Sequence, residues 1–267
     1  MLLERERSCL QITLNMPQVR NALSAQMWQE LADVFDVIRD ERSIRVVVLR
    51  GAGGHFSSGG NTKERNAIGA NNNSVPSQQT AVAERNRFGG SVLARIDHAP
   101  QAVVAVVQGS ALGGGIGLSC AADIVLADHS AMFRLPEAGI GVIPAQIAPY
   151  LVRRIGLSQA RRLALSAATV RAPEALQIGL VHQLSDGAEA LEASVSAVLA
   201  DIDRCGPHAI AASKALFRHA CQADATGIDA YIDTAAELFA AAYCSDEGSE
   251  GANALAQRRR PNWQAPA

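Results

Sequence analysis

VVAVVQGSALGGGIGLSCAADIVLAD, residues 103–128, contains two predicted strands and the helix between them. It begins with a continuous run of β-branched and small apolar residues, 103–107, which indicates a strand buried on both faces. A glycine-rich turn follows, then a helical pattern from 113 to 122, then a second apolar run at 124–127. A strand, a turn, a helix and a strand in this order are typical of an α/β fold.

Similar patterns precede this stretch. Residues 9–15 alternate between apolar and polar side chains, as a half-buried strand does, and residues 46–49 form another continuous apolar run. Ser24 is a good N-cap for an amphipathic helix that extends to about residue 39. Residues 66–77 include an Asn-Asn-Asn-Ser run and a proline, so we expect an exposed loop there, either a surface insertion or a lid beside the site.

The last third of the chain has a different pattern, made of alanine-rich helical segments separated by short Gly, Pro or Asp turns. The predicted helices cover residues 189–204, 207–221, 228–243 and 246–257. We therefore expect an α/β core over residues 1–188 and a helical region over 189–267. Helical tails of this kind often pack on a neighbouring subunit.

Composition restricts the class of protein and its partners. The 267 residues are 48% hydrophobic and 19% charged, with a net charge of −2 and 4% aromatic residues. These values are typical of a soluble globular protein and argue against a nucleic-acid partner. The five cysteines are scattered without a CxxC pair, so we expect a reducing, cytoplasmic location. No run approaches the roughly 20 apolar residues of a membrane span, and the separated histidines indicate no metal site.

Two glycine-rich segments, at 51–64 and 109–123, each follow a predicted buried strand. Neither matches a dinucleotide-binding or phosphate-binding loop, and the chain contains no GxSxG or HExxH motif. Consecutive glycines allow backbone N–H groups to approach a ligand without obstruction by a Cβ atom. Two such donors at one oxygen would form an oxyanion hole. Tight packing of a strand against a helix is the alternative explanation.

Several segments, in order along the chain, resemble the crotonase (enoyl-CoA hydratase/isomerase) superfamily. They are TLNMPQVRNALS at 13–24, FSSGGNTKE at 56–64, ALGGGIGLSCAADIVLAD at 111–128 and FRLPEAGIGVIP at 133–144. The resemblance covers essentially the whole chain. It implies a spiral core of repeated ββα turns with a C-terminal helical region, and an acyl-coenzyme A thioester substrate without a further cofactor. It also implies a homotrimer or a dimer of trimers.

The resemblance implies roles for individual residues. The backbone amides of Gly60 and Gly114 match the two donors of the family's oxyanion hole. The backbone around Ser58 would hold the adenine of coenzyme A. Arg20 and Arg258 match basic residues that contact its phosphates, the second often from an adjacent subunit. An ordinary solvated surface charge is the alternative explanation for both arginines.

Departures from the family's pattern bear on the reaction. The commonest hydratases carry two active-site glutamates, whereas this chain has Gly117 at the first position and Glu137 at the second. Asn61 stands where the family often has aspartate. One carboxylate beside an enolate suffices to add water, or to move a proton between C2 and C4, when an apolar site raises its pKa. Outside this family, a glutamate after a proline is often only a helix-start residue.

The stretch GIGVIPAQIAPYLVRRIG at 139–156 resembles bacterial hydratases of branched glutaconyl-CoA thioesters. Isohexenylglutaconyl-CoA and 3-methylglutaconyl-CoA are such substrates, from acyclic terpene and leucine catabolism. Their second carboxylate needs a cation or several N–H donors when it is buried. The candidates are Lys63, Arg87 and Arg134.

Three functions therefore compete for this sequence. We expect an enoyl-CoA hydratase (a hydro-lyase) acting on a 3-branched glutaconyl-CoA, with Glu137 as base and acid. An enoyl-CoA isomerase would use the same groups and is distinguished by its products from a 3-enoyl thioester. A non-catalytic homologue that binds coenzyme A or serves as a scaffold would show no turnover, and the presence of Glu137 argues against it.

Overall fold

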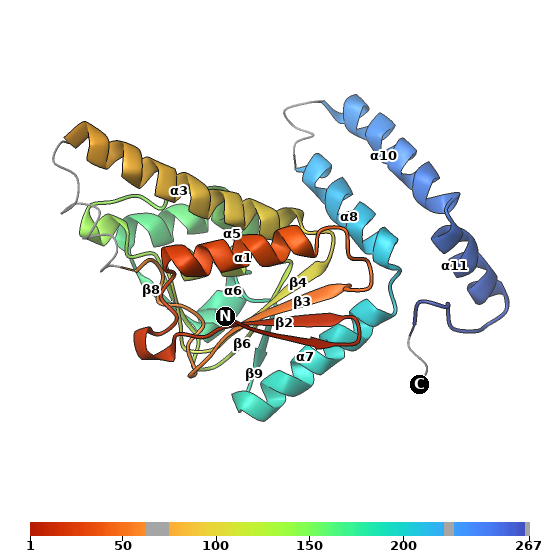
Figure 1. The fold of residues 1–267 in the computed structure, drawn as a ribbon, viewed down its shortest axis with the longest axis horizontal. Helices are drawn as coiled ribbons and strands as arrows, with labels where there is room; N and C mark the ends of the chain where they lie inside the picture. The colour runs from red at the N-terminus through yellow and green to blue at the C-terminus, as the bar shows by residue number, and fades with distance from the viewer. Residues whose placement is uncertain (62–74, 222–226, 265–267) are drawn as a thin grey trace.

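The computed structural model of the chain describes residues 1–61, 75–221 and 227–264 (Figure 1). Its described residues form a six-stranded sheet and a three-stranded sheet, covered by helices and followed by a C-terminal helical region. This is the mixed α/β fold that the sequence predicted.

The larger sheet has the strand order β1-β2-β3-β4-β6-β9. Its strands are β1 (Leu2–Glu6), β2 (Cys9–Leu14), β3 (Val46–Gly51), β4 (Ala102–Val107), β6 (Ile124–Asp128) and β9 (Gln183–Ser185). β1 pairs antiparallel with β2, and the later neighbours pair in parallel. The four strands predicted from the sequence are thus confirmed. Parallel strands place their carboxyl ends at one edge, so the two glycine-rich segments emerge side by side.

The smaller sheet includes the segments that directly follow β4 and β6. It consists of β5 (Ser110–Leu112), β7 (Met132–Arg134) and β8 (Thr169–Arg171), with β5 parallel to β7 and β7 antiparallel to β8. A single parallel bridge between Ser57 and Ala111 adds the loop after β3 to this arrangement. The loops after β3, β4 and β6 are therefore fastened to one another.

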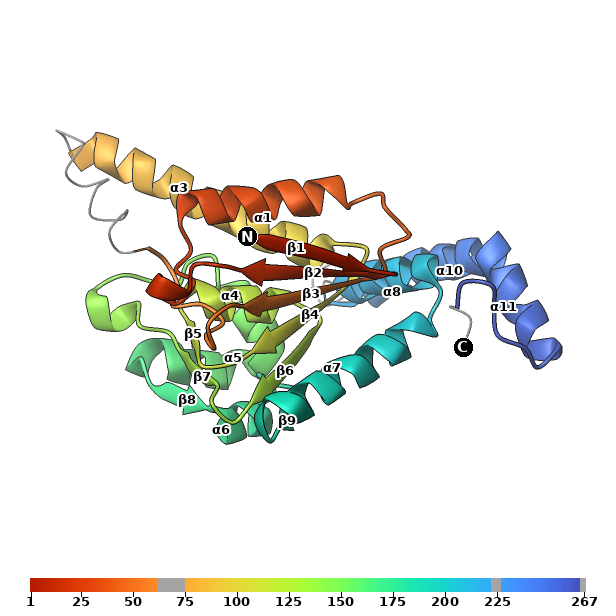
Figure 2. The same ribbon diagram turned by 60° about the horizontal axis from the view of Figure 1, so that its bottom comes forward.

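One face of the large sheet is covered by α1 (Ala25–Val37), α3 (Val75–His98) and α4 (Gly114–Ala121), as Figure 2 shows for α1 and α3. The predicted N-cap is confirmed, because Ser24 Oγ accepts from the Met27 N–H at 3.1 Å. The loop predicted at 66–77 was wrong at its end, since α3 already begins at Val75. A proline is tolerated in the first turn of a helix, where its missing N–H has no intrahelical acceptor. Residues 66–74 lie outside the described residues.

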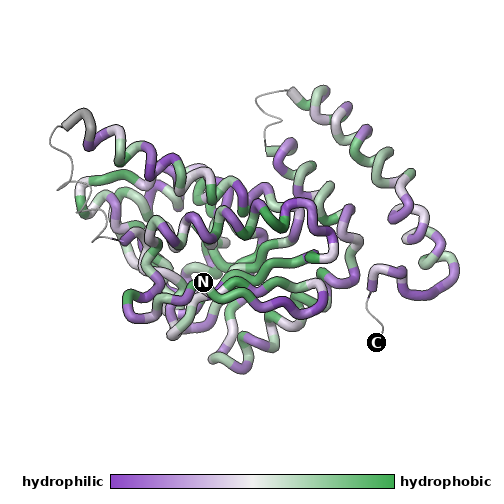
Figure 3. Tube along the Cα trace, in the orientation of Figure 1, coloured by the Kyte–Doolittle hydropathy of each residue, from purple (hydrophilic) through white to green (hydrophobic). Residues whose placement is uncertain are grey.

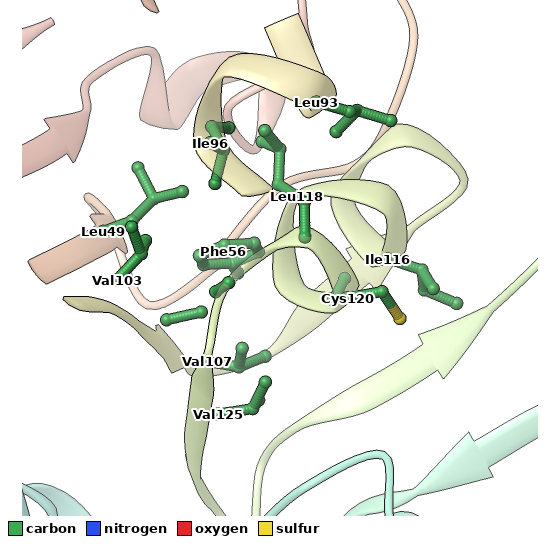
Figure 4. Close-up of a cluster of buried hydrophobic side chains, with 14 of the residues drawn as sticks. Leu49, Phe56, Leu93, Ile96, Val103, Val107, Ile116, Leu118, Cys120 and Val125 are labelled. Atoms are coloured by element: carbon green, nitrogen blue, oxygen red, sulfur yellow. The ribbon is translucent and has the colours of Figure 1, made fainter. Parts of the chain in front are cut away.

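Alternate side chains of the parallel strands enter two different cores. Val47, Leu49, Val103, Ala105 and Val107 face the helices named above. Figure 4 shows some of them around Phe56, with side chains from α3 and α4 closing over it. Helix α4 is buried from its second residue onward, because every residue from 115 to 121 is buried and only Gly114 is partly exposed. A helix that is apolar on all sides is typical of the centre of a core.

The opposite face of the sheet is covered by α7 (Gly187–Asp203), which Figure 2 shows lying along β6 and β9. Leu191, Val195 and Ile202 of this helix pack against the other set of alternating side chains, which includes Val104 and Leu126. By its packing, α7 therefore belongs with the sheet. The predicted division of the chain at residue 188 stays a prediction.

The remaining C-terminal helices are α8 (Pro207–Ala220), α10 (Ile228–Tyr243) and α11 (Asp246–Ala256), close to their predicted bounds. Figure 1 shows α10 and α11 apart from the sheet. Figure 3 shows that both helices contain apolar segments. Helices α5 (Ala148–Ser166) and α6 (Ala172–Gln177) precede α7 in the chain and pack into the same core as α4. None of the described helices is long and apolar enough to cross a membrane.

Candidate active site

The loop after β3 carries the first of the two predicted oxyanion donors. Phe56 is fully buried and anchors this loop in the core. The Ser57 carbonyl accepts from the Leu112 N–H at 2.9 Å. Gly59 follows with a φ of +83°, and a Cβ at Gly59 would lie 2.6 Å from the Leu112 carbonyl oxygen. Glycine is therefore required at position 59. Gly60 follows directly, and a Cβ added to it would have no neighbouring atom within 4 Å.

Helix α4 carries the second donor. Gly113 precedes the helix with a φ of +48°, and its N–H donates to the Arg134 carbonyl at 2.9 Å. Gly114 is the first helical residue, so its N–H has no acceptor within the helix and lies at the positive end of the helix dipole. A Cβ at Gly59 would lie 3.4 Å from the Gly114 nitrogen. The loop that carries Gly60 is therefore in close contact with the start of α4.

Asn21 holds the first loop in this position, a role that the sequence analysis missed. Its side chain is completely buried. Oδ1 accepts from the Met16 N–H at 2.8 Å, and Nδ2 donates to the carbonyls of Ala52 and His55 at 2.9 and 2.6 Å. The Asn21 carbonyl accepts from Ser57 Oγ at 2.8 Å. Its φ of +55° is one that asparagine adopts more readily than most residues, and this preference was the available signal.

Glu137, the predicted catalytic residue, lies beside Gly113, which directly precedes the second predicted donor. A Cβ at Gly113 would be 2.8 Å from Glu137 Oε1. Glu137 Oε2 is buried and has no hydrogen-bond partner among the described residues. Burial raises the pKa of the Glu137 carboxyl, and a hydrogen bond from its own backbone lowers it by less. A half-buried carboxyl with a raised pKa and an unused oxygen is suited to take up and return a proton.

The raised pKa makes stability depend on pH. A carboxyl with a higher pKa in the folded chain favours folding below its ordinary value of 4.5, and this contribution is lost as the pH rises through the folded-state pKa. Glutamine stays neutral, so we expect Glu137→Gln to raise the Tm relative to the parent enzyme at about pH 8 more than at about pH 4. Thermal unfolding at both pH values measures this, and an equal change at both would contradict it.

The position of the family's other glutamate is surrounded by apolar side chains. Gly117 lies one helical turn after Gly113 and is buried. A Cβ at Gly117 would lie 3.2 Å from Ile147 Cγ1 and 3.3 Å from Leu93 Cδ1. Both aliphatic side chains therefore occupy the space that a second carboxylate would need.

We expect Gly117→Glu to destabilise the protein without raising its activity. The new carboxylate would be buried between two aliphatic side chains, at a cost of roughly 3 kcal/mol or more. Gly117→Ala is the matched control, because its methyl group displaces both neighbours only slightly and alanine gains about 1 kcal/mol of helix propensity. Urea unfolding and a hydration assay compare the two variants. A folded glutamate variant with faster turnover would contradict the prediction.

Apolar side chains also line the start of α4. Leu23 Cδ1 and Trp28 Cζ2 lie 2.8 and 3.6 Å from the Cβ position of Gly114. The same indole lies 3.8 Å from the Cβ position of Gly89 on α3. Trp28 therefore fills the gap between α3 and α4 next to the predicted donor. No local sequence pattern singles out this tryptophan, because only the fold brings it to Gly114.

The three cations considered for a second substrate carboxylate have different surroundings. Lys63 lies outside the described residues. Arg87 is exposed on α3, and Arg134 is exposed at the end of β7. Arg134 Nε donates to the Ala167 carbonyl at 2.8 Å. Neither arginine forms an ion pair within the described part of the chain.

Arg20 and Ser58, predicted to contact coenzyme A, lie next to each other. The Ser58 N–H donates to the Arg20 carbonyl at 2.8 Å, and Ser58 Oγ donates to the Val19 carbonyl at 2.9 Å. Arg258 follows α11, which Figure 2 shows on the far side of the core from β5 and β7. A single chain does not bring Arg258 to Ser58, and a contribution from an adjacent subunit stays a prediction.

The chain belongs to the enoyl-CoA hydratase/isomerase family, whose model matches residues 4–266. The expected superfamily and its enzymatic nature are thereby confirmed.

Individual relatives agree with this assignment. Pseudomonas aeruginosa AtuE is 46% identical with a TM-score of 0.92, and the match covers 99% of both chains. An enoyl-CoA hydratase/isomerase from Marinobacter aquaeolei is 40% identical with a TM-score of 0.91, covering 98% of both. The 2,3-dehydroadipyl-CoA hydratase of Escherichia coli (strain K12) is 28% identical over 265 residues, which is 99% of this chain and 98% of the relative.

Proposed function

We propose that this enzyme hydrates a 3-branched glutaconyl-CoA, isohexenylglutaconyl-CoA or 3-methylglutaconyl-CoA, in acyclic terpene or leucine catabolism. The observation that carries the proposal is one carboxylate, Glu137, beside the paired glycines, with aliphatic side chains at Gly117 in place of a second. The name of the Escherichia coli relative specifies a dicarboxylic acyl thioester, which supports a substrate with a second carboxylate.

In this proposal, Glu137 carries out both proton transfers. Its carboxylate takes a proton from water while the water oxygen bonds to C3 of the enoyl group. The electron pair of the double bond moves toward the thioester oxygen, which accepts hydrogen bonds from the Gly60 and Gly114 N–H groups. The protonated Glu137 then returns the proton to C2 of the enolate. One carboxyl group can serve in both steps because burial raises its pKa toward the pH at which the enzyme works.

The surroundings of the glycines support a branched acyl group. Trp28, Leu93 and Ile147 present apolar side chains next to Gly114 and Gly117, and an alkyl branch is stabilised by such contacts. Arg134, whose backbone contacts Gly113, carries a charge that is free to pair with the distal carboxylate. We propose that Arg134 has this role.

A turnover panel tests the substrate. We expect kcat/KM for a 3-branched glutaconyl-CoA to exceed that for crotonyl-CoA at least tenfold, because a buried branch and a paired carboxylate each contribute to discrimination. Arg134→Gln should lower kcat/KM for the dicarboxylic thioester and leave that for crotonyl-CoA within about twofold. Equal or faster turnover of crotonyl-CoA by the parent enzyme would overturn the choice of substrate.

Isomerisation of an enoyl-CoA is the second candidate, because a single carboxylate beside an enolate is equally suited to carry a proton between C2 and C4. A 3-enoyl-CoA incubated with the enzyme distinguishes the two. A hydratase leaves it unchanged, whereas an isomerase converts it to the 2-enoyl thioester. Accumulation of the 2-enoyl product without a hydroxyacyl product would favour the isomerase.

We also propose that the C-terminal helices form a homotrimer, alone or as a dimer of trimers. α8, α10 and α11 expose large apolar side chains, namely Phe217, Ile228, Ile232, Phe239, Tyr243 and Leu255. Side chains of this kind on adjacent helices mark a protein interface. Light scattering after size-exclusion chromatography is expected to give three or six chains, and Phe239→Asp should lower that number. A monomer in the parent protein would contradict the proposal.

A further inference from the structure

Leu23 lies at the junction of the three segments that build the site. It is fully buried and directly precedes the N-cap of α1. Its N–H donates to the Gly59 carbonyl at 2.7 Å, and its carbonyl accepts from the Asn61 N–H at 3.3 Å. These bonds form a parallel bridge with Gly60 at its centre. The backbone of Leu23 therefore holds both chain neighbours of the first predicted donor.

The side chain of the same residue contacts the second donor. Leu23 Cδ1 lies 2.8 Å from the Cβ position of Gly114, closer than any other atom. Since real side-chain contacts are longer than this, the space beside the Gly114 Cα is already filled. One residue thus contacts Gly60 through its backbone and Gly114 through its side chain.

The two glycine donors need a neighbouring residue that fixes their positions. Gly60 and Gly114 have no side chains that could fix their orientation, and glycine has the largest conformational freedom of any residue. Leu23 itself is held on both sides, by the buried Asn21 and by Ser24, which caps α1. Its position is therefore set by the core and not by a bound ligand.

We propose that Leu23 is a positioning residue that sets the distance between the two oxyanion amides. The proposal rests on the proposed function, because it requires Gly60 and Gly114 to act on one oxygen. A change in this distance weakens the bonds to the developing oxyanion more than it weakens substrate binding. Substitution of Leu23 therefore lowers kcat and leaves KM nearly constant.

Two variants of Leu23 test the role. Leu23→Ile keeps the volume and moves the methyl group away from Gly114, and we expect kcat to fall about tenfold. Leu23→Ala removes the contact, and we expect a fall of about 10²-fold. Leu126→Ala is the matched control, because Leu126 is equally buried but lies on the opposite face of the sheet, against α7. Its kcat should stay within about twofold at a similar loss of stability.

A compensating pair gives a second test. Gly114 has a helical conformation that alanine tolerates, so Gly114→Ala should lose activity through its collision with Leu23. In the double variant with Leu23→Ala, the new methyl group occupies the vacated space. We expect the double variant to be at least tenfold more active than the product of the two single effects predicts. Multiplicative effects would overturn the proposal.

A spectroscopic measurement separates this proposal from the proposed function. Two N–H donors on a conjugated thioester oxygen polarise the carbonyl and shift the ultraviolet absorption of the bound enoyl group to longer wavelength. The shift is recorded at early times in a Glu137→Gln background, where the substrate is consumed about 10³-fold more slowly. No shift with Leu23 present would refute the oxyanion hole itself. A full shift that is unchanged by Leu23→Ile and Leu23→Ala would refute only the role of Leu23.

Discussion

Replacement of Glu137 by glutamine is expected to lower kcat for hydration by about 10³-fold, while coenzyme A binding stays unchanged. Glutamine has nearly the same shape and cannot take up or return a proton. General acid–base catalysis contributes about 10²–10⁴-fold, and here both transfers depend on the same side chain. Steady-state kinetics with an enoyl-CoA substrate and calorimetric titration with coenzyme A measure the two quantities separately.

Glu174→Gln is the control for this experiment. Glu174 is a partly exposed glutamate on α6 that pairs with Arg162 at 2.6 Å, and loss of such a surface pair changes stability by less than about 1 kcal/mol. Its kcat is expected to match that of the parent enzyme. A Glu137→Gln variant that retains more than about one tenth of the parent kcat would rule out Glu137 as the proton-transfer group.

Replacement of Asn21 by alanine is expected to destabilise the enzyme by roughly 3 kcal/mol or more. Three hydrogen bonds of the buried side chain are lost, and each leaves a partly buried backbone group without its partner. The positive φ adds a further cost for alanine. Urea unfolding measures the change as a lower midpoint at an unchanged m-value.

Asn21→Asp separates the shape of the side chain from its donor groups. Aspartate keeps the acceptor for Met16 but places a carboxylate beside two carbonyl oxygens, so it should be no more stable than the alanine variant. Asn253→Ala, at an exposed position of α11, should change stability by less than about 0.5 kcal/mol. Stability of Asn21→Ala within 1 kcal/mol of the parent would show that Asn21 does not hold the loop.

Local patterns were sufficient to predict four strands of the larger sheet and most helices, whereas β1, β9 and the strands of the smaller sheet were not predicted. The continuous apolar runs of β3 and β4 and the capped helix after Ser24 are properties of a few neighbouring residues, and such patterns depend little on the rest of the fold. The carboxyl-terminal end of the loop at 66–77 was mispredicted because one proline was taken as a helix breaker. In the first turn of α3 the same proline is compatible with a helix.

The contacts within the site could not be read from local pattern. Gly60, Gly114 and Glu137 were named from a resemblance, whereas the neighbours that shape their surroundings come from distant segments. Trp28 reaches Gly114 from α1, and nothing in its own sequence neighbourhood indicates this. Such tertiary contacts depend on how the helices cross over the sheet, which periodicity does not encode.

The burial of α4 from residue 115 to residue 121 separates a constant part of this enzyme from a variable one. A helix with seven consecutive buried residues cannot shift its first N–H without disturbing the core, so the predicted donor at Gly114 is expected to be the same for every substrate. Around Gly114 and Gly117, the side chains of Trp28, Leu93 and Ile147 belong to α1, α3 and the segment before α5. Directed evolution toward other acyl groups is therefore expected to collect its mutations in those three segments and to leave α4 unchanged.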